Sequence, residues 1–95
     1  METYYGKHVL FALHFTHLTE NMFISELKTT VAVESEQQLI HEIARNVAHL
    51  TRFDWVSSSK ITDRYRTKDR DLMGKFEFGN QLVYFSADEC SLTHN

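Results

Sequence analysis

The sequence predicts an α+β two-layer sandwich, in which one helix crosses one face of an antiparallel sheet of about five strands, in the order ββαβββ. Three features of the chain predict this architecture. One segment, residues 35–50, is a long amphipathic helix by its spacing; two alternating segments precede it; and a glycine-asparagine turn separates two more near the C-terminus. The 95 residues suffice for one core, so residues 1–95 are expected to form a single domain.

The helical segment places its apolar residues at steps of three and four, which brings them onto one stripe wide enough to lie on a sheet. Ser35 and Gln38 have the spacing of a capping box, and Glu36 puts negative charge in the first turn, where the helix dipole favours it. The stripe predicted to face the sheet consists of Leu39, Ile40, Ile43, Ala44, Val47, Leu50 and Thr51.

Two segments before the helix, residues 7–18 and 22–33, alternate between two faces and predict a hairpin. Pairing Leu13 with Leu27 keeps both apolar sets on one side, and that parity requires an odd-numbered loop. Residues 19–21 fit a three-residue loop in which Asn21 takes the left-handed conformation. The face expected under the helix includes Phe11, Leu13, Phe15, Phe23, Leu27, Val31 and Val33.

Beyond the helix, residues 53–65 are expected to be extended, although the three serines at 57–59 are equally compatible with a loop. Residues 66–74 are polar and predict a turn. Residues 75–85 predict a hairpin about Gly79 and Asn80, with Phe76 facing Val83 and the neighbouring Phe78 also inward. We expect the ordered part to span about residues 5–87 and the polar tail, residues 88–95, to be flexible.

Composition narrows the class of protein. Hydrophobic residues make up 42% of the chain, which is sufficient for a core without disulfides or a metal ion. The one cysteine, Cys90, cannot form an internal disulfide, so a cytoplasmic location is expected. No signal peptide is recognisable, and no apolar stretch approaches the roughly 18 residues that a membrane span requires. The net charge of −3 argues against indiscriminate binding to nucleic acid or anionic membranes.

The histidines do not predict a metal site. His14 and His17 are three apart in a strand, so they point to opposite faces. His41 and His49 share the polar side of the helix but stand roughly 12 Å apart, too far to bind one ion without a third element. Residues 41–45 begin like the H-E-x-x-H zinc helix, yet Arg45 stands where the second ligand would have to be. We therefore expect no metal and no cofactor.

Catalytic motifs are equally lacking. The chain has no G-x-S-x-G and no glycine-rich phosphate loop. Cys90 and His94 are a nucleophile and a base by type, but they lie in the polar tail, where nothing orders them. Asp69, Asp71 and Glu77 are scattered around turns. The sequence thus predicts no catalytic residues, and enzyme activity ranks third among the functions considered.

Half of the ten basic residues fall between positions 60 and 70. Arginine with tyrosine can contact phosphate and stack on bases, as single-strand binders do. Asp63, Asp69 and Asp71 interleave with the basic residues and weaken this interpretation, so a solvated turn is favoured over nucleic-acid binding. The candidate nucleic-acid contacts are Lys60, Arg64, Tyr65, Arg66, Lys68 and Arg70.

The sheet face away from the helix also carries apolar residues, and one helix cannot cover both faces. Monomers rarely expose large contiguous apolar patches, so this face is expected to meet a protein partner or a second copy about a two-fold axis. Whether its two halves are contiguous depends on strand order, which the sequence leaves open. The candidate protein interface consists of Leu10, Ala12, Ile24, Leu82 and Tyr84.

The function expected first is therefore a non-catalytic protein-binding module, a homodimer that acts by occupying a surface on a larger partner. Small cofactor-free domains of this kind include inhibitors and accessory proteins of phages and other mobile elements. The alternative is nucleic-acid binding through residues 60–70. Neither expectation rests on a sequence motif.

Overall fold

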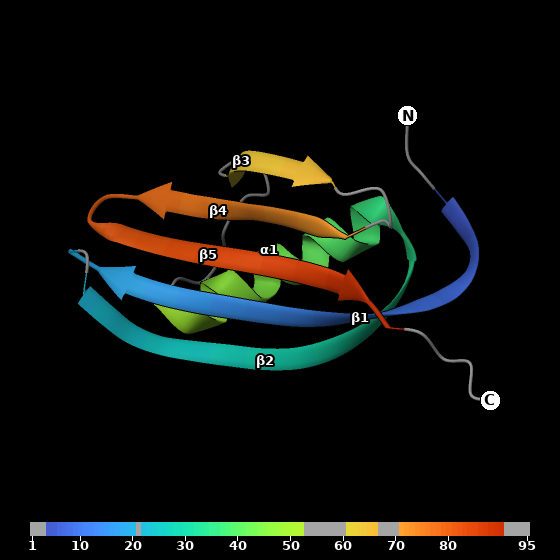
Figure 1. Cartoon of the computed structure of the whole chain (residues 1–95), viewed down its shortest axis with the longest axis horizontal. Helices are drawn as coiled ribbons and strands as arrows, with labels where there is room; N and C mark the ends of the chain where they lie inside the picture. Colours follow the sequence, from blue (N-terminus) through green and yellow to red (C-terminus); the bar gives the residue numbers. More distant parts are fainter. Residues whose placement is uncertain (1–3, 21, 53–60, 67–70, 91–95) are drawn as a thin grey trace.

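The computed structural model describes residues 4–20, 22–52, 61–66 and 71–90. Within these residues it confirms the α+β architecture: five antiparallel strands form one sheet in the order β2-β1-β5-β4-β3, and one helix lies against one of its faces (Figure 1). The elements are β1 (Tyr4–Thr19), β2 (Met22–Ser35), α1 (Glu36–Thr51), β3 (Ile61–Arg66), β4 (Leu72–Phe78) and β5 (Gln81–Glu89).

The helix begins at the predicted Ser35 cap and ends at Thr51, one residue beyond the predicted end. The Ser35 hydroxyl accepts a hydrogen bond from the Gln38 backbone N–H at 3.1 Å, which satisfies one of the unpaired donors of the first turn. The Gln38 side chain accepts one from the N–H of Glu34, one residue earlier than a capping box would place it. Arg52 adopts the left-handed conformation, φ 63°, and its N–H bonds the carbonyl of Ala48 to close the helix.

The core lies between α1 and the sheet. The predicted stripe is confirmed, with Ile40 and Leu50 half-buried at its margins, and Ala48 is a buried residue that the prediction omitted. From the sheet, alternate residues of β1, β4 and β5 point at the helix, as period-two alternation requires. The largest fully buried side chains are Phe11, Phe15, Phe76, Leu13, Leu39, Ile43, Leu72, Val33, Val47 and Val83.

The predicted register of the first hairpin was wrong by two residues. Leu13 lies opposite Thr29, and Leu27 lies opposite Phe15. Because the difference is an even number of residues, Leu27 still faces the helix side of the sheet.

The loop of this hairpin was also predicted incorrectly. Thr19 pairs directly with Met22, so the turn has two residues, and Glu20 has the positive φ of 53°; Asn21 lies outside the described residues. A two-residue turn alone would reverse the faces of β2, but a bulge restores them, since Leu18 is opposite Phe23 and Ile24 is the extra residue. The bulge carries Phe23 to the face away from the helix, where 61% of it is exposed. The prediction that Phe23 lies under the helix was therefore wrong.

The C-terminal hairpin has the predicted register, with Phe76 opposite Val83 about a turn in which Gly79 takes φ 61°. Its strands are longer than predicted. β4 begins at Leu72, inside the segment expected to be a turn, because Leu72 is buried opposite Ala87. β5 continues to Glu89, within the segment expected to be flexible.

The sequence of the segment after the helix is compatible with either a strand or a loop. Residues 61–66 form β3, the end strand of the sheet beside β4. The predicted extended structure over residues 53–60 lies outside the described residues.

Candidate functional site

The face of the sheet opposite α1, here called the open face, carries no second layer among the described residues (Figure 1). The strand order settles the question that the sequence left open, because β1 lies directly between β2 and β5. Leu18 of β1 is therefore opposite Leu82 of β5, and Thr16 is opposite Tyr84. The two hairpins thus contribute side chains to one end of the same face.

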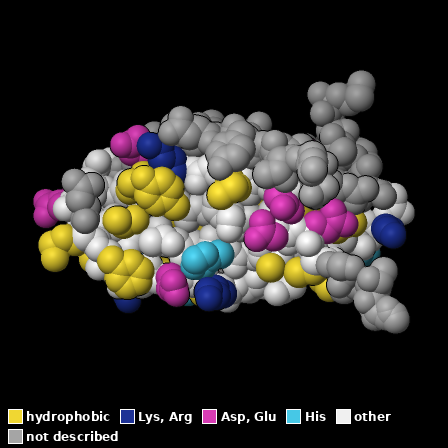
Figure 2. All heavy atoms as spheres, in the orientation of Figure 1, with side chains coloured by type: hydrophobic (Ala, Val, Ile, Leu, Met, Phe, Trp, Pro, Cys, Tyr) yellow, Lys and Arg dark blue, Asp and Glu magenta, His cyan; other side chains and the backbone are white. Residues whose placement is uncertain are grey.

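Four residues form an apolar cluster at this end, here called the hairpin-end patch: Leu18, Phe23, Leu82 and Tyr84. Phe23 and Tyr84 are 61% and 48% exposed, and Leu18 and Leu82 are half-buried beside them. Ile24, the extra residue of the bulge, is also exposed next to Phe23. Figure 2 shows hydrophobic side chains gathered at this end of the open face, at the left of the view.

The hairpin-end patch is held by a bond between the two turns. The backbone N–H of Glu20 in the first turn donates to the carbonyl of Asn80 in the second at 3.0 Å. Beneath the patch, on the helix side, the buried His17 ring is hydrogen-bonded through Nε2 to Gln81 Oε1 at 2.8 Å. Both contacts join the β1–β2 hairpin to the start of β5, so the patch is pre-formed.

The middle of the open face is polar. His14 Nε2 lies 3.3 Å from Glu26 Oε2, and Lys28 is opposite His14 on β2. A shallow hollow of about 280 Å³ lies beside them, lined by Ala12, Leu13, His14, Lys28, Thr29, Thr30 and Asp88.

The structure therefore divides the predicted protein interface. It brings Leu82 and Tyr84 together with Ile24 nearby, but Ala12 stands opposite Asp88, six residues or roughly 20 Å along β1 from Leu18. Leu10 lies further still in the same direction. Acidic groups flank this far end, where the Asp71 carboxylate accepts a hydrogen bond from the Glu89 N–H at 3.1 Å. Leu10 and Ala12 belong to a separate surface.

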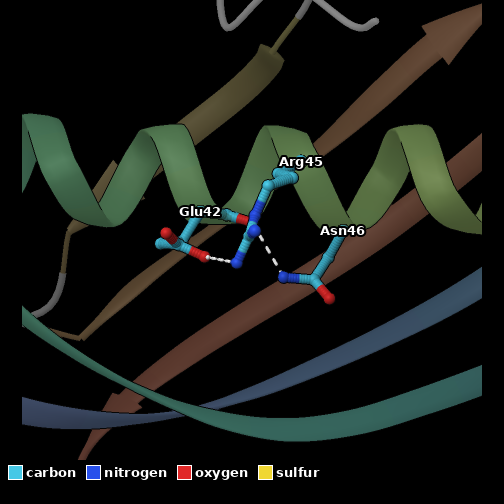
Figure 3. Close-up of polar contacts among 3 residues, drawn as sticks. All are labelled: Glu42, Arg45 and Asn46. Carbon is cyan, nitrogen blue, oxygen red and sulfur yellow. Dashed lines mark hydrogen bonds and ion pairs between the residues drawn. The ribbon is translucent and has the colours of Figure 1, made fainter. Parts of the chain in front are cut away.

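The polar side of the helix carries an ordinary ion pair. Arg45 Nη2 lies 2.7 Å from Glu42 Oε1, and the Asn46 side chain donates to the Glu42 backbone carbonyl at 2.8 Å (Figure 3). The Glu42 carboxylate of the zinc-like sequence is thus paired with Arg45. His41 and His49 are exposed, and the described part of the chain contains no group of three side chains suited to hold a metal ion.

The other candidate residues that the structure describes are not members of the patch. His14 and His17 occupy opposite faces, as predicted, with His17 buried and His14 on the open face. Cys90 is half-buried, and its backbone N–H donates to the Leu10 carbonyl at 2.8 Å, which extends the pairing of β5 with β1. His94 lies outside the described residues.

Of the basic segment, the structure describes the backbone of Arg64, Tyr65 and Arg66, which belong to the edge strand β3. Lys60, Lys68 and Arg70 lie outside the described residues. Of the six candidates for nucleic-acid contact, the structure therefore places three consecutive residues on one strand.

Phe23 belongs to the hairpin-end patch, and sequence reasoning missed it. Its assignment to the open face depends on the bulge, and a local pattern of alternating residues gives no signal for an extra residue in a strand. Leu18 was missed for a different reason, since it gains its apolar neighbour Leu82 only through the β1–β5 pairing.

Within the described residues, no helix is long and apolar enough to cross a membrane. Comparisons of the chain with protein-family models, with curated proteins and with solved structures found no match.

Proposed function

We propose that the protein is a non-catalytic protein-binding module and that the hairpin-end patch is its contact surface. One observation carries the proposal. The large hydrophobic residues that are exposed in the described part of the chain, Met22, Phe23, Ile24 and Tyr84, all lie at the hairpin end of the sheet. Contiguous exposed apolar surface on a small domain typically marks a site of interaction.

The surroundings of the patch support the same function. Lys75 is opposite Tyr84 and Glu77 is opposite Leu82 on β4, while Glu26 borders the patch on β2. An apolar centre with a charged border is the usual anatomy of a specific interface. The bond between Glu20 and Asn80 holds the two turns together, and a pre-formed surface binds with a smaller entropic cost than one that must be ordered.

Small inhibitors and accessory proteins act by occupying a surface of a larger protein. We place the chain in that class, whose members are encoded by phages and other mobile elements. The proposed location is a reducing cytoplasm, in which the single Cys90 would stay a thiol.

Tyr84→Glu is expected to weaken partner binding by about 30-fold or more, because aromatic residues at an interface centre dominate the binding energy. The partner is first identified with a photo-reactive residue at position 84 in cells that express the protein, and is then purified. Its affinity for the wild-type chain and for Tyr84→Glu is measured by titration calorimetry.

The matched control is Ala12→Glu, which introduces the same charge at an exposed position of the open face outside the patch. It is expected to leave the affinity unchanged. Equal losses for both variants would show that the patch has no special role, and a partner cross-linked equally well from position 12 would contradict the assignment.

Nucleic-acid binding through the basic segment is the second candidate, and the observation in its favour is that Arg64 and Arg66 lie on an edge strand. If it holds, affinity for single-stranded oligonucleotides will fall steeply with rising salt, and replacing both arginines with alanine will abolish it without changing the thermal melt. Labelled DNA or RNA that is not retarded at low salt by micromolar protein would eliminate this candidate.

A further inference from the structure

Among the described residues, no strand pairs with the outer edge of β2, and this edge is the second surface that could bind a partner. β2 ends the sheet and has 14 residues. In the middle of β2, Leu27 and Val31 are half-buried, whereas their neighbours on β1, Phe15 and Phe11, are buried. Val33, nearer the start of the helix, is buried. Two apolar side chains of the edge strand therefore stay partly accessible.

An edge strand presents backbone N–H and C=O groups that can pair with another strand. Natural proteins protect long edges with proline, with bulges or with charged side chains. The chain contains no proline, and the bulge of β2 lies at Ile24, near the start of the strand. In the middle of β2, Glu26 and Lys28 carry opposite charges on either side of Leu27. When a second copy of this triplet runs antiparallel to the first, Glu26 of each copy lies opposite Lys28 of the other. The segment is therefore complementary in charge to a second copy of itself.

We propose that a second copy of the chain pairs with this edge, β2 against β2, antiparallel about a two-fold axis at Leu27. This register places Glu26 of each copy opposite Lys28 of the other, and opposite charges across a strand pair stabilise it. The bulge at Ile24 ends this register at Ser25, which lies opposite Thr29 of the second copy, so Phe23 of the hairpin-end patch lies beyond the strand pair.

Other registers of the strand pair leave charged side chains or backbone groups without a suitable partner. An axis at Thr29 places Glu26 opposite Ala32 and loses both ion pairs, and an axis at Thr30 places Glu26 opposite Glu34, where like charges repel. An axis at Val31 would pair Lys28 with Glu34. That register is disfavoured because the Glu34 N–H is already bonded to Gln38 Oε1, and because Glu26 would have no opposite residue, since β2 ends at Ser35.

Pairing at the edge joins two sheets into one and places both helices on the same side. The two open faces then share the other side, and each hairpin-end patch keeps Tyr84, on β5, away from the new strand pair. The dimer is thus independent of the proposed function, and the assembly would offer two binding patches to a partner.

Charge reversal tests the register. The wild-type chain is expected to show twice its 11.2 kDa mass in light scattering and to dissociate on dilution. E26K and K28E each place like charges opposite one another at both symmetric positions, which should raise the dimer dissociation constant about tenfold or more. An equimolar mixture of the two variants should restore the dimer, because each introduced charge then meets its opposite.

E34K is the matched control. Glu34 pairs with His8 at 3.3 Å as Glu26 pairs with His14 at 3.3 Å, so both variants lose one exposed ion pair of β2, but position 34 lies outside the proposed strand pair. E34K should keep the wild-type mass, and so should Tyr84→Glu. A wild-type chain that is monomeric at all concentrations would overturn the proposal. Equal dissociation of E26K and E34K would also overturn it, and so would a mixture of E26K and K28E that does not recover the dimer. A monomeric Tyr84→Glu would indicate dimerisation through the open faces instead.

Discussion

Ile43→Asp is expected to unfold the domain, or to leave it only marginally folded. Ile43 is fully buried at the centre of the helix stripe, in the core between α1 and the sheet. An aspartate there would either bury an unpaired charge or take up a proton to avoid one, and both outcomes cost several kcal/mol out of a total stability of about 5–15 kcal/mol. Circular dichroism during a thermal melt is the measurement.

His41→Asp is the control for this substitution. His41 is exposed on the polar side of the same helix, so the variant has the same new side chain in the same element without burying it. Its melting temperature is expected to stay close to that of the wild type, since surface substitutions usually change stability by less than about 0.5 kcal/mol. A cooperative melt of Ile43→Asp within about 2 °C of the wild type would show that the helix presents a different face to the sheet.

Phe15→Ala is expected to lower the free energy of unfolding by about 3–5 kcal/mol, because it removes a buried aromatic ring and leaves a cavity that the core closes only in part. Phe15 is 1% exposed and lies between Leu27 of β2 and Phe85 of β5 in the sheet. For a domain of this size, the change corresponds to a fall in melting temperature of at least about 12 °C. Urea unfolding measures the free energy directly.

Phe23→Ala removes the same ring from the neighbouring strand and is the matched control. Phe23 is 61% exposed on the open face, so the loss is expected to be below about 1 kcal/mol. A loss as large as that of Phe15→Ala would mean that Phe23 lies under the helix, as its place in the alternating pattern suggests, and would contradict the bulge. Phe23→Ala also tests the hairpin-end patch. A variant that stays folded but binds the partner more weakly would show that Phe23 contributes to binding and not to stability.

The elements that the sequence predicted correctly depend on neighbours in the chain. The helix is encoded by apolar residues three and four apart and by the Ser35 cap, whose partner Gln38 is three residues away. The turn at Gly79 is encoded by the one residue type that takes a positive φ without strain. The order of the elements follows from such local signals, and so does the inward face of the C-terminal hairpin.

The candidate site depends on contacts between residues far apart in the chain. The extra residue at Ile24 and the two-residue turn before it compensate for each other, so the alternating pattern of β2 looks regular while Phe23 changes face. The placement of β1 beside β5 joins Leu18 to Leu82 and separates both from Ala12. By itself the sequence determined the helix, the faces of most strands and the class of fold, because period and turn chemistry act locally. Strand order and the bulge were decided by tertiary structure, since pairings such as Glu20 with Asn80 form only when the whole sheet assembles.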